Sequence, residues 1–324
     1  MIGGERSIPS LSVVLPVYNQ QRYVRAAINS ILTQTYRDFE LLVVDDGSTD
    51  ETPRIVASID DSRLRLIRNP HNGFIAALKT GIEAARAPWI ARMDSDDLSA
   101  RRRFELQMDF VEKNCDCVFV GSVFGIVTPN DRFLDPVDRF EARFLTADDI
   151  SMARVSFADP SAVFSRQVAL ECGLYDSDFP GNEKPLWYKM LSKGRGAVIG
   201  QPLHYVRWRL GSLSRTNLSK GWLDNRSIRE RYDPESLKAL SQKRFPGGER
   251  ASMSATVRCH DYYLLARDFD AAREVVRGAL RQAPASGAVW KMFLKSTLRR
   301  RHFRGTKARY DVPYTPINHQ PVQL

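Results

Sequence analysis

Short apolar runs alternate with helix-patterned segments along the first third of the chain. Four of these runs predict buried strands, at Leu11–Leu15, Phe39–Val44, Leu64–Ile67 and Trp89–Met93. Between them, apolar residues at i, i+3 and i+4 spacing predict a helix over Val24–Leu32, and Gly73–Ala85 predicts another. Strands that alternate with helices favour right-handed βαβ units. The pattern therefore predicts an α/β fold with a mostly parallel central sheet flanked by helices.

The polar segment after the second predicted strand carries a helix-start signature. Ser48-Thr49-Asp50-Glu51 matches the capping box, in which a serine and a glutamate three residues later satisfy free backbone N–H groups. We therefore expect the helix between the second and third strands to open at this box.

The pattern is less regular in the middle of the chain. It becomes irregular beyond Gly121 until about Asp148, and strand-like and helix-like pieces return over Val155–Arg207. We assign residues 1–220 to a single α/β domain on this basis.

A helical pattern dominates from about Asp233 onward. Tyr262–Leu280 and Ala288–Leu298 predict one antiparallel helix pair, and the sequence holds no second copy of it. Residues 221–324 are therefore predicted to form a helical C-terminal extension.

The composition favours a globular protein without a membrane span. Hydrophobic residues make up 43% of the 324 residues, and no apolar run approaches the ~20 residues that a spanning helix needs. The polar start, Met1–Ser10, lacks the apolar core of a signal peptide. The four cysteines show no metal-ligand spacing, so we expect reduced thiols in a cytoplasmic protein.

The net charge of +10 comes entirely from the predicted extension. Residues 1–220 hold 28 basic and 28 acidic residues, whereas residues 221–324 hold 20 and 10. The basic residues are densest at Arg299, Arg300, Arg301, Arg304, Lys307 and Arg309. Such a block indicates either a peripheral contact with an anionic membrane surface or a solvated basic tail. We expect no nucleic-acid binding, because the domain is charge-balanced and no recognised reader motif appears.

Three aspartates, Asp94, Asp96 and Asp97, stand directly behind the fourth predicted strand. Ionised carboxylates this close repel one another, and a divalent cation such as Mg²⁺ or Mn²⁺ relieves the repulsion. A solvated acidic turn with a helix N-cap is the alternative. Polar residues also follow the first two strands, at Tyr18-Asn19 and Asp45-Asp46. Because ligands bind beyond the carboxyl ends of parallel strands, we expect all three groups to meet at one edge.

The phosphate-binding motifs of two common enzyme classes are missing. The sequence has no G-x-G-x-x-G after its first strand and no G-x-x-x-x-G-K-[ST]. Dinucleotide oxidoreductases and P-loop proteins therefore lose their main sequence support.

Five motifs together resemble one family. They are S-V-V-L-P-V-Y-N, S-I-L-T-Q-T-Y-R-D-F-E-L-L-V-V-D-D-G-S-T-D, N-P-H-N-G-F-I-A-A-L-K-T-G-I, W-I-A-R-M-D-S-D-D-L, and the pair Arg103 and Gln107. In this order and spacing they resemble the family-2 glycosyltransferases of the GT-A fold, the bacterial type that builds surface polysaccharides. The resemblance covers residues 11 to about 115 almost without gaps and weakens towards Ser214. It implies a nucleotide-binding half over about 11–120 and an acceptor half over about 121–220.

The resemblance implies roles for particular residues. Pro16 and Tyr18 would line the base pocket, and Asp46 would accept a hydrogen bond from the base. Asp94 and Asp96 would hold Mn²⁺ or Mg²⁺ on the nucleotide diphosphate. The remaining contacts to the nucleotide would come from Asn19, Ser95, Arg207 and Arg209. The alternatives are plain packing for Tyr18 and turn chemistry for Asp46-Gly47.

The acceptor half departs from the family pattern at three places. Asn182 and Glu183 stand where the family has a Glu-Asp pair, so Glu183 is the shifted candidate for the catalytic base. Asp159 replaces the family's histidine before Pro-Ser and is a second candidate base. Arg209 replaces a second histidine and keeps a cation near the diphosphate. Glu183 could instead be an exposed helix-start carboxylate.

The resemblance implies an inverting, metal-dependent glycosyltransferase. A sugar would pass from a nucleotide-diphosphate sugar, with a UDP-sugar favoured, to the hydroxyl of a sugar or lipid-linked acceptor. The implied process is polysaccharide or glycoconjugate biosynthesis, and the basic extension adds the alternative of a cytoplasmic protein that is peripheral at the inner face of the membrane. The alternative is a non-catalytic relative that still binds nucleotide.

Overall fold

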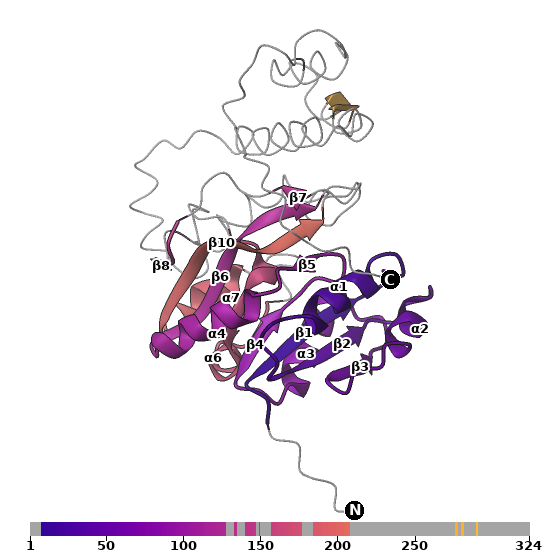
Figure 1. Cartoon of the computed structure of the whole chain (residues 1–324), viewed down its shortest axis with the longest axis horizontal. Coiled ribbons are helices and arrows are strands. Elements are labelled where there is room, and N and C mark those ends of the chain that lie inside the picture. Colours follow the sequence, from indigo (N-terminus) through magenta and orange to yellow (C-terminus); the bar gives the residue numbers. More distant parts are fainter. Residues whose placement is uncertain are drawn as a thin grey trace, which may run out of the picture.

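The computed structural model describes residues 8–127, 133–134, 140–146, 149, 157–176, 184–207, 276–277, 280–281 and 290. Its centre is a ten-stranded sheet in the order β3-β2-β1-β4-β9-β6-β10-β5, with β7 paired to β6 and β8 to β10 (Figure 1). The predicted α/β class is therefore confirmed.

The first half of the sheet is parallel, as predicted. Its strands are β1 (Leu11–Val17), β2 (Phe39–Asp45), β3 (Leu64–Arg68) and β4 (Trp89–Arg92). The helices that follow the first three strands are α1 (Val24–Leu32), α2 (Thr52–Ala57) and α3 (Phe74–Ala84). Each predicted element of this half appears within a few residues of its expected limits, because each carries its own apolar period.

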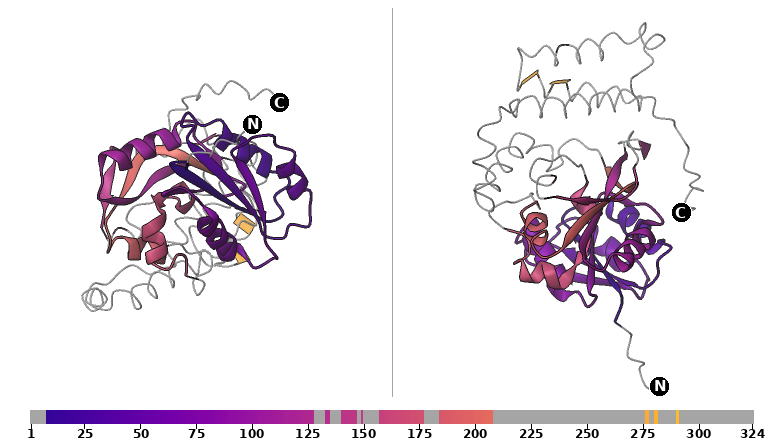
Figure 2. Two further views of the ribbon diagram at one scale, coloured as in Figure 1. Left: turned by 90° about the horizontal axis from the view of Figure 1, so that it is seen from below. Right: turned by 90° about the vertical axis from the view of Figure 1, so that its left-hand side faces the viewer.

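Helices cover both faces of the sheet (Figure 1 and Figure 2). On one face, Ile28 of α1 and Phe104 of α4 (Arg103–Lys113) pack with Val13 of β1 in one apolar cluster. On the other face, Leu78 of α3 packs with Val14 in a second cluster. Successive residues of a strand point to opposite faces, so β1 serves both layers with apolar residues at every position except Ser12.

The second half of the sheet mixes strand directions. Its strands are β5 (Leu98–Ser99), β6 (Cys117–Val127), β7 (Phe133–Leu134), β8 (Arg143–Leu145), β9 (Val163–Ser165) and β10 (Arg195–Arg207). The short strand β9 runs antiparallel between β4 and β6, whereas β6 and β10 are parallel. The helical pieces here are η1 (Asp159–Ser161), α6 (Arg166–Glu171) and α7 (Lys184–Met190).

The expected irregularity beyond Gly121 is wrong for residues 122–127. Strand β6 continues through Gly121 to Val127 as one eleven-residue strand. A Cβ at Gly121 would stand 2.5 Å from the Phe157 ring, so this glycine admits a packed aromatic ring instead of ending the strand.

The prediction that a capping box at Ser48 opens the next helix is also wrong. Helix α2 begins at Thr52, and Glu51 makes no side-chain cap hydrogen bond. The Ser48 hydroxyl accepts instead from the Asn19 N–H at 2.9 Å, and Asp50 accepts from the Thr52 N–H at 2.9 Å. A contact between the loops after β1 and β2 thus uses the Ser48 hydroxyl that a capping box would need.

The predicted extension lies almost entirely outside the described residues. Five of its residues are described, and all five are helical: Val276, Arg277, Leu280, Arg281 and Trp290. The helix pair and the boundary at residue 220 therefore stay predictions. Among the residues that the structure describes, no helix is long and apolar enough to cross a membrane. Cys115, Cys117 and Cys172 are free thiols.

Candidate active site at the carboxyl edge of the sheet

Four loops leave the sheet at the same edge, because β3 is also parallel to β2 and ends beside it, with Arg68 paired to Asp45. The register pairs Val17 with Asp45, and Val14 with Arg92, so β1, β2 and β4 run in parallel into this edge. The residues that follow these strands therefore meet there, as expected from the sequence.

The loop after β1 is tied to the loop after β2. Pro16 is buried within β1, whereas Tyr18 keeps 41% of its surface exposed. Asn19 adopts a left-handed backbone with φ of 51°, and its Oδ1 accepts from the Thr49 N–H at 2.9 Å. Asn19 thus joins the two loops, and an asparagine tolerates this backbone better than most residues.

Asp46 is a buried carboxylate that is held by two backbone hydrogen bonds. It is 3% exposed and accepts from the backbone N–H groups of Asn72, at 3.0 Å, and Gly73, at 2.8 Å. The Nδ1 of His71 lies 3.1 Å from Asp46 Oδ2, and the His71 ring stacks on Tyr18 with centroids 4.2 Å apart. We call these three side chains the Tyr18–Asp46–His71 cluster.

The sequence assigned no role to His71. The histidine lies within the N-P-H-N-G motif, four residues after the third predicted strand, Leu64–Ile67. Because parallel strands end at one edge of the sheet, this position is a signal that could have placed His71 near Tyr18 and Asp46. Gly47 allows the His71 backbone to pack closely against the loop after β2. Its backbone has φ of +76°, and a Cβ at this position would stand 3.1 Å from the backbone nitrogen of His71.

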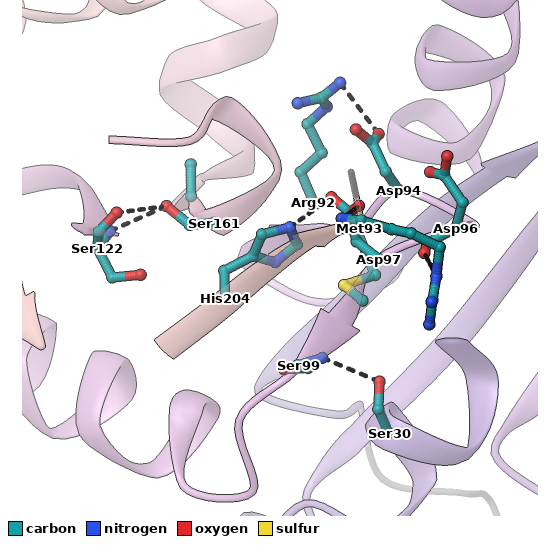
Figure 3. Close-up of polar contacts among 12 residues, drawn as sticks. Ser30, Arg92, Met93, Asp94, Asp96, Asp97, Ser99, Ser122, Ser161 and His204 are labelled. Carbon is teal, nitrogen blue, oxygen red and sulfur yellow. Dashed lines mark hydrogen bonds and ion pairs between the residues drawn. The ribbon is translucent and has the colours of Figure 1, made fainter. Parts of the chain in front are cut away.

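The three aspartates behind β4 divide into two groups. Figure 3 shows the carboxylates of Asp94 and Asp96 projecting to the same side, whereas Asp97 turns towards His204. The Asp94 side chain is 31% exposed and pairs with Arg92 at 3.2 Å. Ser95, between the two outward aspartates, is buried.

Asp97 belongs to the interior and not to the open edge. Its Oδ1 accepts from the Arg207 backbone N–H at 2.8 Å, and its Oδ2 lies 2.7 Å from His204 Nε2. Burial, together with the neighbouring Asp96 carboxylate, raises the pKa of Asp97 well above its usual range. Burial, together with the Arg103 guanidinium, lowers the pKa of His204 well below its usual range.

Arg103 is the centre of a buried polar network beneath this loop. Its guanidinium is fully buried and donates to the Arg92 carbonyl at 2.9 Å, and its Nη1 lies 3.2 Å from His204 Nδ1. Burial lowers the pKa of Arg103 to about 9. Gln107 accepts from Arg103 at 3.0 Å and donates to the Ser161 carbonyl at 2.7 Å. The network therefore links the aspartate loop to η1.

The hydrogen bonds of this network define the state of His204. An arginine only donates, so His204 Nδ1 is the acceptor and Nε2 carries the proton that points at Asp97. A neutral histidine satisfies both contacts, in agreement with its lowered pKa.

Arg207 reaches the aspartate loop from β10. Its Nε donates to the Asp96 carbonyl at 2.9 Å, and its guanidinium lies over the Tyr23 ring at 4.9 Å. The structure thus brings Arg207 to the edge that the sequence predicted. Arg209 and Glu183 lie outside the described residues.

Asp159, the second candidate base, begins η1 and is half-buried. Its Oδ1 accepts from the indole N–H of Trp187 on α7 at 2.6 Å. Trp187 is itself fully buried, so one oxygen of Asp159 is held by the packed core.

The outward aspartates fit a divalent cation. No group of three or more His, Cys, Asp or Glu residues that could hold a metal occurs within the described part of the chain. Mg²⁺, however, is usually bound by one or two carboxylates together with water and substrate phosphates. Asp94 and Asp96 supply such a pair, on one side of the loop and in part exposed.

Comparisons with known proteins agree with this geometry. The sequence profile described as Glycosyl transferase family 2 matches residues 12–171. The chain is 38% identical over 121 residues to UDP-Glc:alpha-D-GlcNAc-diphosphoundecaprenol beta-1,3-glucosyltransferase WfgD of Escherichia coli, covering 37% of this chain and 47% of that protein. It is 27% identical over 226 residues to glycosyltransferase GlyG of Streptococcus pneumoniae, covering 65% of this chain and 75% of that protein.

The fold also matches a solved structure. That of S. aureus TarS 1-349 in complex with UDP-GlcNAc superposes with a TM-score of 0.54 at 17% identity, covering 85% of this chain and 92% of that solved chain. The likeness confirms the GT-A architecture. Several curated relatives are much longer than the matched region, which spans from 19% to 47% of seven of them.

Proposed function

We propose, from the match of residues 12–171 to the profile described as Glycosyl transferase family 2, that the protein transfers a sugar from a nucleotide-diphosphate sugar to an acceptor hydroxyl. The observation that carries the proposal is the shared sheet edge. At this edge, an exposed aromatic ring follows β1, a buried carboxylate follows β2, and the outward carboxylates of Asp94 and Asp96 follow β4.

The two ends of a nucleotide-sugar donor have matching groups at this edge. Tyr18 offers a ring face for a base, and Asp46 offers a carboxylate that accepts an N–H. Asp94 and Asp96 would hold the cation that binds the diphosphate. When bound, this cation neutralises the charge that develops on the departing diphosphate. UDP is the favoured nucleotide, since WfgD is named for UDP-Glc and TarS was solved with UDP-GlcNAc.

A general base must take the proton of the acceptor hydroxyl as this hydroxyl attacks the sugar. We assign it to Glu183, which directly precedes α7, with Asp159 as the second candidate. Trp187 of α7 holds one oxygen of Asp159, so the position of Asp159 depends on the packing of this helix. A single displacement by the acceptor would invert the configuration at the sugar.

The acceptor is inferred from the name of a relative, and the location from the charge of the predicted extension. WfgD is named for a lipid-linked diphosphoundecaprenol acceptor. A basic extension that contacts anionic lipid would bring this domain to such an acceptor. We therefore propose a cytoplasmic protein that is peripheral at the inner face of the membrane and acts in polysaccharide or glycoconjugate biosynthesis.

Donor hydrolysis and transfer assays test the proposal. The full-length protein is incubated with a panel of UDP- and other nucleotide-sugars, with Mn²⁺, with Mg²⁺ and with EDTA. Release of the nucleoside diphosphate that depends on the cation and increases with acceptor supports a metal-dependent transferase. Nucleotide binding without turnover, across all donors and acceptors, would instead identify the non-catalytic relative.

A further inference from the structure

His71 contacts both groups that would receive a nucleobase. Its ring stacks on Tyr18, with centroids 4.2 Å apart and planes inclined by 23°. Its Nδ1 lies 3.1 Å from Asp46 Oδ2 and 2.9 Å from the Asp46 carbonyl oxygen. His71 therefore uses one ring face and one nitrogen in the same way as a stacked, hydrogen-bonded base.

The hydrogen bonds determine which nitrogen carries the proton. Both Asp46 atoms facing Nδ1 are acceptors, so Nδ1 must be the donor. The imidazole thus offers Asp46 a planar ring with an N–H, as uracil does through its N3–H. At a centroid separation of 4.2 Å no second ring fits between His71 and Tyr18.

We propose that His71 occupies the nucleobase subsite of the ligand-free protein and that an incoming nucleotide must displace it. The proposal rests on the proposed function, because it takes Tyr18 and Asp46 as the base-binding groups. A base that stacks on this ring face and reaches Asp46 needs the volume that the imidazole fills. Nucleotide affinity is then reduced by the fraction of molecules in which His71 has swung out.

The backbone around His71 is held by hydrogen bonds and packing, so the side chain is the part that can move. The N–H groups of Asn72 and Gly73 are both bound to the Asp46 carboxylate, and Gly47 packs against the His71 backbone. The His71 side chain itself is 57% exposed, so a rotation about its χ1 can carry the ring into solvent. Such a rotation breaks the stack and the Nδ1 hydrogen bond without moving the loop.

The free energy needed to rotate His71 out of the subsite is the same for every nucleotide, because the rotation precedes binding of the base. Removing the imidazole should therefore strengthen the binding of UDP and CDP by the same factor. Inorganic diphosphate occupies no base subsite, so its affinity should stay unchanged. A His71 that instead contacts the bound base would affect UDP and CDP differently.

Calorimetry with Mn²⁺ on the full-length protein tests this. We expect His71→Ala to lower the Kd of UDP and of CDP by about tenfold each, with the Kd of diphosphate unchanged. Arg54→Ala is the matched control, because its side chain is 83% exposed on α2, and it should bind all three ligands like the wild type. In a Tyr18→Ala background, where the stack is already lost, His71→Ala should have a smaller effect.

Two results would overturn the proposal. Weaker UDP binding in His71→Ala would make His71 a contact of the bound base, and unchanged binding would make it irrelevant to the subsite. A wild type that binds diphosphate but no nucleotide would contradict the proposed function instead, so the two failures are distinguishable. A His71→Phe variant keeps a stacking ring without the donor, and should bind UDP with an affinity between those of the wild type and His71→Ala.

Discussion

At the scale of single residues, adjacent aspartates have different roles. Asp45 accepts from the Ser48 N–H within its own turn, whereas Asp46 holds the loop before α3. Asp96 lies at the open edge with its side chain beside that of Asp94, whereas its neighbour Asp97 is buried against His204. Identical residues one position apart thus differ because a turn points successive side chains in different directions.

Asp96→Ala should remove Mn²⁺-dependent nucleotide binding and leave the fold intact. The substitution deletes one of two outward carboxylates, and losing one crowded negative charge relieves repulsion in the metal-free protein. Calorimetry with UDP, with and without Mn²⁺, measures the effect, and thermal unfolding checks the fold. Wild-type Mn²⁺-dependent affinity in this variant would contradict the role of Asp96.

Asp46→Asn should weaken both nucleotide binding and the loop that Asp46 holds. The amide cannot accept with both of its terminal atoms, so one of the N–H groups of Asn72 and Gly73 loses its partner. Hydrogen bonds to charged groups contribute about 1.5–3 kcal/mol. We expect a lower Tm together with a higher UDP Kd, whereas diphosphate binding with Mn²⁺ should persist. A stable variant with unchanged UDP affinity would contradict this assignment.

Glu183→Gln should bind the donor normally but transfer sugar roughly 10²–10⁴-fold more slowly, since an amide cannot take the proton. The loss should appear in kcat and not in KM. Asp159→Asn is the comparison variant, because it keeps an oxygen that can accept from Trp187. If only Asp159→Asn loses turnover, the base is Asp159 and the assignment to Glu183 is wrong.

At the scale of elements, a second buried network joins strands at the opposite edge of the sheet. Glu40 on β2 accepts from the Ser12 hydroxyl on β1 at 2.7 Å and from the Arg86 N–H before β4 at 2.9 Å. The Ser12 hydroxyl in turn accepts from the Ala87 N–H at 3.1 Å. One carboxylate therefore connects three consecutive parts of the parallel sheet.

This network predicts an acid-sensitive contribution to stability. Burial alone would raise the pKa of Glu40, but hydrogen bonds from Ser12 and Arg86 outweigh burial and lower it below 4.5. A lowered pKa in the folded state stabilises the protein above the unfolded pKa, and this contribution is lost as the pH falls through the folded pKa. Glu40→Gln should therefore destabilise the protein at pH 7 by about 1.5–3 kcal/mol.

Urea unfolding at several pH values checks this prediction. The difference between the wild type and Glu40→Gln should shrink as the pH falls below 4.5. Glu51→Gln is the control, because its pair with Arg54 is exposed and contributes roughly 0–1 kcal/mol. A difference between wild type and Glu40→Gln that is the same at every pH would show that the Glu40 charge is not responsible.

At the scale of the whole molecule, charge separates the two predicted parts of the chain. The excess of basic residues lies entirely in residues 221–324, and Arg299, Arg300 and Arg301 are its densest run. Replacing these three with Gln should weaken binding to phosphatidylserine vesicles by roughly a hundredfold, at about 1 kcal/mol for each arginine. Co-sedimentation at two salt concentrations measures this. Equal vesicle binding by the wild type and the triple variant would favour the interpretation of residues 299–301 as part of a solvated basic tail.

The amino-acid sequence alone determined the parallel half of the sheet. The apolar runs and helix periods of residues 11–92 each act over a few neighbouring residues, so they can be interpreted without a structure. The order of β1, β2 and β4 then brought Tyr18, Asp46 and Asp94 to one edge, because parallel strands end together. The GT-A fold was implied by the resemblance of the sequence motifs to the family-2 glycosyltransferases.

Only the tertiary structure decided which polar groups meet. Ser48 bonds to Asn19 instead of capping α2, Asp97 turns inward to His204, and His71 covers the ring of Tyr18. Gly121 continues β6 because Phe157, distant in sequence, packs over it. Each outcome is a competition between a local hydrogen bond or turn and a partner many residues away. A local pattern contains no information about that distant partner, so these contacts could not be predicted from the sequence.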